Sequence, residues 1–205
     1  MTRLPMFPLQ TVVFPFGLLP LHVFEDRYRR MIADCLADDG RFGVVLIERG
    51  SEVGGGDARA SIGTEARIVE HQELDDGRYI VIAIGIRRIA VETWLPDDPY
   101  PQASVTVLEE PPAPAGVAAR VPETARALRR LLLLYSELGV DVGDAALEFG
   151  DAAEDAVFQM CAVAPAGPLD AQQMLAATDS TARLTLLEDW IADESATLER
   201  RLGGG

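Results

Sequence analysis

Hydrophobic residues near the start of the chain come in short runs that are interrupted by prolines, at Pro5, Pro8, Pro15 and Pro20. A proline has no N–H to donate to a β-ladder, so prolines at this density are typical of strand ends, sheet edges and bends. The pattern predicts a β-core that closes on itself through sharp corners, with one helix across an open end.

The first helix is predicted over residues 25–38. Its apolar positions follow the spacing i, i+3, i+4, i+7 and i+8 and form one stripe: Tyr28, Met31, Ile32, Cys35 and Leu36. Gly40 is placed to end this helix. The continuous apolar run over residues 41–48 then predicts a strand that is buried on both faces.

A β-hairpin is predicted where residues 61–74 and 78–91 flank the sequence Asp75-Asp76-Gly77. In its second arm large and small side chains alternate, with Ile80, Ile82, Ile84 and Ile86 on one face and Val81, Ala83 and Gly85 on the other. The small face suits close packing by a neighbouring element. Residues 102–109 predict one further strand.

Residues 49–60 contain three consecutive glycines, at positions 54–56. Such a segment is typical of a mobile surface loop. The alternative is a loop that cradles a phosphate, but that geometry needs a helix to follow, and residues 61–69 predict a strand. We therefore expect a surface loop.

The composition changes after residue 110, from strand-like to rich in Ala and Leu. We expect a β domain over residues 1–110, a proline-rich linker over 111–120 and a helical subdomain over 121–205. Helices are predicted over residues 122–138, 144–149, 151–163 and 169–177, and from residue 179 onward. The first of these would carry Pro122 in its first turn.

A series of short motifs follows in a fixed order: Phe7-Pro8-Leu9, Phe14-Pro15, Leu19-Pro20-Leu21-His22-Val23-Phe24-Glu25, Arg27-Tyr28, Phe42-Gly43-Val44-Val45-Leu46, Gly63-Thr64-Glu65-Ala66 and Asp76-Gly77-Arg78-Tyr79. Together they resemble the N-terminal substrate-recognition domain of the Lon ATP-dependent proteases. The resemblance is nearest to the stand-alone bacterial proteins that carry this domain without the ATPase and peptidase domains.

This resemblance implies an α+β protein in which a PUA-like β-pseudobarrel is followed by a C-terminal α-helical bundle. It implies a non-catalytic module that binds unfolded or extended polypeptide, or one specific protein partner, as an adaptor in protein quality control. Two positions depart from the family pattern. Asp26 stands where Pro is frequent, and Ile89 stands where an aromatic residue often follows the Arg of a G-x-x-R element.

The net charge is −15, from 18 basic and 33 acidic residues. A surface of this charge repels phosphate backbones and anionic membranes, so we expect neither a nucleic-acid nor a membrane partner. RNA binding is the alternative hypothesis, because PUA-like folds often bind RNA. Every basic residue is an Arg, and without Lys the chain can form neither a P-loop nor a Ser–Lys protease site.

The two cysteines, Cys35 and Cys161, each lie in a helical apolar pattern, which rules out a disulfide framework and indicates a reducing compartment. The N-terminus lacks the pattern of a signal peptide. No apolar run reaches the ~20 residues that span a bilayer. We expect a cytoplasmic protein.

The chain contains two histidines, His22 and His71. A His22–Cys35 dyad would need a reactive thiol, but Cys35 belongs to the apolar stripe of its helix, where a thiol is usually inert. His71 lies near Glu70 and Glu73, which are too few ligands for a metal site. We therefore expect no catalytic residues, no metal and no cofactor.

A peptide-binding surface is predicted at the junction of the first strands and the first helix. Its residues are Pro20, Leu21, Phe24, Glu25, Arg27, Tyr28 and Arg88. The apolar members would form an exposed patch for a partner chain, although core packing is favoured for Phe24. An apolar barrel face could also support a homodimer.

The polar members of this set have an alternative, structural interpretation. Glu25 would cap the helix, and it would form an ion pair with the barrel, for example with Arg88. Arg87 and Arg88 would project to opposite faces of a strand, so one of them lies near the core and needs a carboxylate, for which Glu65 and Glu25 are candidates.

Overall fold

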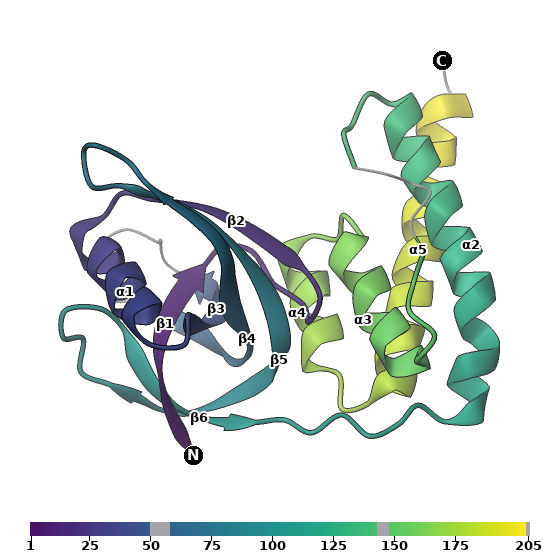
Figure 1. Ribbon diagram of the computed structural model, residues 1–205. Coiled ribbons are helices and arrows are strands. Elements are labelled where there is room, and N and C mark those ends of the chain that lie inside the picture. The colour runs from purple at the N-terminus through teal and green to yellow at the C-terminus, as the bar shows by residue number, and fades with distance from the viewer. Residues whose placement is uncertain (50–57, 143–147, 204–205) are drawn as a thin grey trace. The chain divides into compact units, whose positions relative to one another are not determined.

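The computed structural model describes residues 1–49, 58–142 and 148–203. The chain divides into two compact units, Met1–Glu109 and Glu110–Gly205, the first built on strands and the second on helices (Figure 1). The predicted glycine loop at 54–56 and the first four residues of the helix predicted over 144–149 lie outside the described residues. Glu148 and Phe149 are described and are not helical.

The first unit is a six-stranded sheet with the strand order β2-β5-β4-β3-β1-β6. The strands are β1 (Thr2–Leu9), β2 (Leu18–Val23), β3 (Arg41–Arg49), β4 (Ala58–Glu73), β5 (Tyr79–Leu95) and β6 (Gln102–Val107). β5 pairs with β2 through its first part and with β6 through its last part, so the sheet closes into a barrel. β1 and β3 run parallel, and the other pairs are antiparallel. The predicted α+β class is confirmed.

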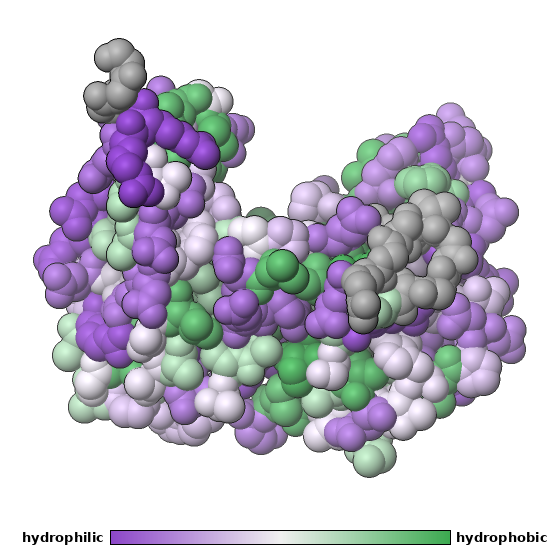
Figure 2. All heavy atoms as spheres, turned by 180° about the vertical axis from the view of Figure 1, so that it is seen from behind, coloured by the Kyte–Doolittle hydropathy of each residue, from purple (hydrophilic) through white to green (hydrophobic). Residues whose placement is uncertain are grey.

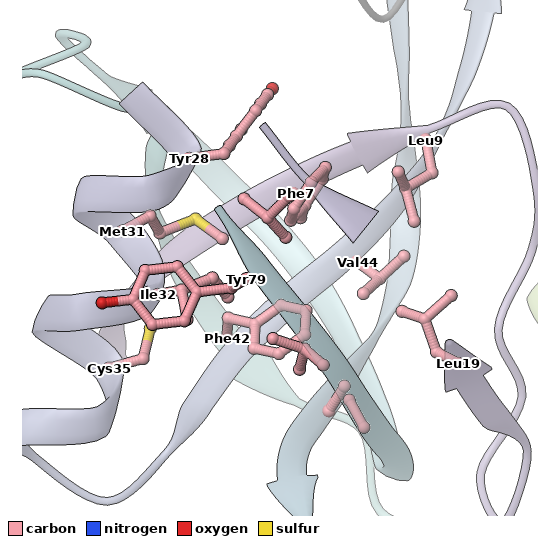
Figure 3. Packing of buried hydrophobic residues seen from close by; sticks show 14 of the residues in the cluster. Phe7, Leu9, Leu19, Tyr28, Met31, Ile32, Cys35, Phe42, Val44 and Tyr79 are labelled. Atoms are coloured by element: carbon pink, nitrogen blue, oxygen red, sulfur yellow. The ribbon is translucent and has the colours of Figure 1, made fainter. Parts of the chain in front are cut away.

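Helix α1 (Asp26–Ala37) packs on the barrel core through the predicted stripe. Its buried residues meet those of β1, β3 and β5 in one hydrophobic cluster (Figure 3). Burying a large apolar side chain stabilises the fold by roughly 1.5–3 kcal/mol, so this stripe holds the helix in place. Gly40, with φ +75°, donates its N–H to the carbonyl of Cys35 and ends the helix as predicted.

The predicted hairpin forms between β4 and β5, with Gly77 at φ +78° in the turn. The alternation along β5 is also as predicted, and the structure shows which face is which. Val81 and Ala83 are fully buried inside the barrel, whereas Ile80 is 46% exposed on the outside. The large isoleucines therefore point away from the core, and the small residues make room for the packed interior.

The second unit contains α2 (Ala115–Glu137), α3 (Ala153–Val163), α4 (Pro168–Ala176) and α5 (Ser180–Gly203). The predicted start of the first helix is wrong, because α2 begins at Ala115 and carries Pro122 in its interior. Contacts made by the earlier turns override this local signal. Val117 is buried, and Arg120 pairs with Glu188 of α5. The helix ends at Glu137, and Gly139, two residues later, adopts φ +77° as is typical after a helix C-terminus.

A fully buried arginine, Arg183 of α5, ties the helical unit together. Its guanidinium donates to the carbonyls of Met174 (3.1 Å) and Ala177 (3.2 Å) and lies 3.9 Å from the ring centroid of Phe158. Glu110 lies 3.5 Å away and offsets the charge. Within the described residues, no helix combines the length and the apolar character needed to cross a membrane.

Candidate functional site

The outer face of β2 and β5 carries a row of exposed and half-buried side chains. Residues paired directly across antiparallel strands point to the same face, and the register pairs Leu18 with Ile84, Pro20 with Ile82, and His22 with Ile80. We call these six residues the β2–β5 surface. Leu18 is 69% exposed. Seen from behind, the molecule shows separate hydrophobic patches within a largely hydrophilic surface (Figure 2). Exposed apolar side chains that share one face of a sheet are a candidate binding site.

A phenylalanine lies at each end of β2. Phe16 precedes the strand and is 40% exposed, and Phe24 follows it and is 59% exposed. The prediction that Phe24 packs in the core is wrong. Val23 takes the inward position, with 2% exposure, and the alternation of a strand turns the next side chain outward. The Phe24 ring lies 6.2 Å from the ring of His22, between centroids.

Phe16 adopts a left-handed backbone conformation, with φ +67°. It is the third residue of a turn closed by the Gly17 N–H, which donates to the carbonyl of Phe14 (3.0 Å), with Pro15 second. This is the geometry of a type II turn, which favours Gly or Asn in the third position. A bulky residue there costs about 1–2 kcal/mol. The residue is 40% exposed, so complete burial in the core does not account for a phenylalanine at this position.

The same turn continues into a β-bulge against β5. The Phe16 N–H donates to the carbonyl of Gly85 (2.8 Å), and the Gly85 N–H donates to the carbonyl of Gly17 (2.9 Å). A Cβ on Gly85 would lie 2.1 Å from the carbonyl oxygen of Phe14. This position of β5 therefore needs a glycine for the turn to pass over it.

The free edge of β2 is interrupted in its middle by Pro20. The hydrogen-bonded pair Gly17–Gly85 sets the alternation along the strand, so the backbone groups of Leu18, Pro20 and His22 face away from β5. Pro20 has no N–H to offer, which disfavours addition of another strand along this edge. A partner chain is therefore better accommodated on the face of the surface than on its edge.

The predicted cluster of Glu25, Arg27 and Tyr28 is partly a core element. Tyr28 is 4% exposed, and its ring stacks on that of Phe7, so it cannot line a binding surface as predicted. Arg27 covers it, with the guanidinium 4.5 Å from the ring centroid. Glu25 occupies the N-cap position without a side-chain capping bond, and accepts a hydrogen bond from Arg27 (3.1 Å) instead.

Arg88 is also buried, at 3% exposure, so its predicted place on the binding surface is wrong. Glu65, one of the two candidate carboxylates, is itself 3% exposed. It accepts hydrogen bonds from Arg87 (2.6 Å) and Arg41 (2.8 Å). The carboxylate therefore pairs with the more exposed of the two neighbouring arginines. Of the seven predicted residues, Pro20 and Phe24 are exposed, Glu25 and Arg27 are half-buried, and Leu21 packs against the barrel core and is partly buried.

The structure does not assemble a His22–Cys35 dyad. The Cys35 thiol donates to the carbonyl of Arg41, and burial, followed by the charges of nearby aspartates, raises the pKa of the thiol to about 12. His22 instead contacts Arg78, 3.2 Å from Nε2. Across residues 1–49, 58–142 and 148–203, no three His, Cys, Asp or Glu side chains form a group that could hold a metal ion.

A cavity of about 530 Å³ lies between α2 and α5 in the helical unit. Its central carboxylate, Glu188, accepts hydrogen bonds from Arg120 and from Thr124 (2.6 Å). Burial opposes ionisation of this group, but these two donors hold the pKa of Glu188 below its ordinary value. Glu188, Arg120 and Thr124 thus satisfy one another and do not converge on an open position.

Comparison with known proteins assigns residues 3–193 to the model of the ATP-dependent protease La (LON) substrate-binding domain. Lon protease 2 of Myxococcus xanthus is 35% identical over 109 residues, which are 52% of this chain and 13% of that protein. Lon protease 2 of Bdellovibrio bacteriovorus is 26% identical over 203 residues, which are 96% of this chain and 25% of that protein. The chain thus spans a quarter or less of the length of these relatives.

Two solved structures have a similar fold. The Lon N-terminal domain protein from Xanthomonas campestris matches with a TM-score of 0.69 and 27% identity, and the alignment covers 93% of this chain and 99% of that one. The N-terminal domain of the Mycobacterium avium complex Lon protease matches with a TM-score of 0.66 and 20% identity, covering 94% of this chain and 99% of that one.

Proposed function

Because this chain belongs to the family of ATP-dependent protease La (LON) substrate-binding domains, we propose that it binds unfolded or extended polypeptide through the β2–β5 surface and Phe24. The observation that carries this proposal is the outward row of apolar side chains, in which Leu18 is 69% and Phe24 59% exposed. Unfolded chains present apolar side chains that folded proteins bury, and each Å² removed from water contributes about 25 cal/mol.

We propose that the module binds without catalysis and serves as an adaptor in protein quality control. Its thiols support this interpretation, because burial raises the pKa of both Cys35 and Cys161 to about 12, and thiolate nucleophiles need a lowered pKa. Both cysteines are free, which fits a reducing compartment such as the cytoplasm.

The test is a titration of the full 205-residue chain with fluorescently labelled, reduced and carboxymethylated α-lactalbumin, followed by fluorescence anisotropy. We expect saturable binding that changes little between about 50 and 200 mM salt, because apolar contacts are not screened. Phe24→Ser should weaken binding about fivefold or more. Leu169→Ser is the matched control, since Leu169 is 67% exposed but lies in the helical unit.

Two outcomes would count against the proposal. Equal loss of binding in Phe24→Ser and Leu169→Ser would show that the β2–β5 surface is not the site. Tight retention of a single-stranded polyuridylate that collapses over the same salt range would favour RNA binding instead. Native, disulfide-intact α-lactalbumin should bind much more weakly than the unfolded form.

A further inference from the structure

We infer that the site prefers extended segments with two large apolar residues about eight positions apart, one held at Phe16 and the other at Phe24. This inference rests on the proposed function and names the class of polypeptide segment that the binding site selects. It assigns to Phe16 a role in binding that the sequence motifs do not indicate.

The two aromatic rings lie at opposite ends of β2. Phe16 and Phe24 bracket β2, and each exposes 40% or more of its surface. At ~3.3 Å per residue, the eight steps from Phe16 to Phe24 span at most about 26 Å, of which the six residues of β2 account for about 20 Å. An extended ligand that lies along the strand covers this length with about eight residues. Two of its side chains can then reach the two phenylalanines at once.

The surface between the two rings recognises side chains rather than the backbone of a ligand. Pro20 interrupts the outer edge of β2, so the backbone of a ligand cannot pair along the whole strand. The ligand is accommodated on the face of the sheet, over Leu18, Ile80 and Ile82. These side chains are apolar and have no groups that donate or accept hydrogen bonds. Recognition therefore depends on where the ligand's apolar side chains fall, which makes their spacing the selected property.

The backbone conformation of Phe16 is unusual for a large residue. A turn position that favours glycine holds a large aromatic residue at φ +67°, and the ring is left partly in solvent. Phe14, two residues earlier, is 3% exposed and so contributes to the core. Phe16, in contrast, is not one of the buried core residues. An unfavourable conformation that presents an exposed side chain is typical of functional surfaces.

The test uses labelled peptides built from Gly and Ser that carry two Phe residues about four, eight or twelve positions apart, and one peptide with a single Phe. Affinities for the full chain are measured by fluorescence anisotropy. We expect the peptide with the middle spacing to bind about tenfold more tightly than the single-Phe peptide, because the second contact becomes intramolecular. The other two spacings should gain less than about threefold.

Two variants of Phe16 distinguish the contribution of its ring to binding from the effect of its backbone conformation. Phe16→Ala and Phe16→Gly should each reduce the affinity for the middle spacing to about the single-Phe level, while changing single-Phe binding by no more than about twofold. Because Phe16→Gly relieves the backbone, a loss of binding in that variant cannot be attributed to unfolding. Leu169→Ala serves as the surface control.

Equal affinity for all three spacings would overturn the inference and leave the proposed function in place. The same holds if Phe16→Gly retains the preference for the middle spacing. Failure of every peptide and of unfolded α-lactalbumin to bind would instead reject the proposed function itself.

Discussion

The ring of Phe7 on β1 lies flat against the ring of Tyr28 on α1, with centroids 4.1 Å apart and planes 8° from parallel (Figure 3). This stack fixes the first turn of α1 to the barrel. Between β2 and this turn, the chain places Val23 inside and leaves Phe24 outside. The stack therefore helps to hold Phe24 in its exposed position at the end of the β2–β5 surface.

The first prediction concerns stability on the two sides of this junction. Tyr28→Ala removes a buried aromatic ring and should lower the free energy of unfolding by about 3–5 kcal/mol. Phe24→Ala removes an exposed ring and should change it by no more than about 0.5 kcal/mol. Urea denaturation followed by circular dichroism measures both values. Similar losses in the two variants would contradict the assignment of Tyr28 to the core and Phe24 to the surface.

The second prediction concerns the strained turn. Phe16→Gly removes the steric conflict at φ +67° and should raise the free energy of unfolding by up to about 1 kcal/mol, since glycine's larger unfolded-state entropy offsets part of the gain. Phe16→Ala retains a Cβ and should not stabilise the protein. If both substitutions shift the thermal midpoint equally, the ring and not the backbone sets the stability at this position.

Periodicity was a reliable guide to burial in the first unit. The helical stripe correctly placed Tyr28 in the core. The prediction that the same residue lines a binding surface was wrong, because residues in the apolar stripe of a helix pack against the core even when their side chains carry a polar group. The alternation along β5 separated Ile80 from Val81 correctly. For Phe24, hydrophobicity favoured the core, yet its place after the inward Val23 already pointed outward.

Other features depend on contacts distant in sequence, which local patterns do not contain. Gly85 is required because the turn at Phe14 crosses it. Arg183 is buried because the C-terminal end of α4 and the residue after it present the carbonyls of Met174 and Ala177 to its guanidinium. Helix α2 begins at Ala115, seven residues before the proline that was expected to mark its first turn. This early start also follows from contacts between residues that are distant in sequence.

The third prediction compares two glycines. Gly85→Ala would place a Cβ 2.1 Å from the carbonyl oxygen of Phe14, a backbone atom that cannot move without breaking the turn. We expect a loss of about 3 kcal/mol or more in the free energy of unfolding. Gly116, in α2, has no atom within 4 Å of the equivalent Cβ, so Gly116→Ala should stabilise by about 0.5–1 kcal/mol. Thermal and urea unfolding provide the measurement, and a tolerated Gly85→Ala would rule out the close crossing.

The fourth prediction concerns acid stability and rests on Glu188, whose two donors, Arg120 and Thr124, join α2 to α5. Burial favours the neutral form, but the hydrogen bonds outweigh it and hold the pKa of this carboxyl below its ordinary value of 4.5. A group whose pKa is lower in the folded state stabilises the protein above the unfolded pKa, and this contribution is lost as the pH falls through the folded value. Unfolding free energies measured down to pH 3 should therefore decline less steeply below pH 4.5 in Glu188→Gln than in the unmodified protein. Glu199→Gln, at an exposed position of the same helix, should retain the full decline. A Glu188→Gln variant whose acid profile runs parallel to that of the unmodified protein would show that this carboxylate is not held by its two donors in solution.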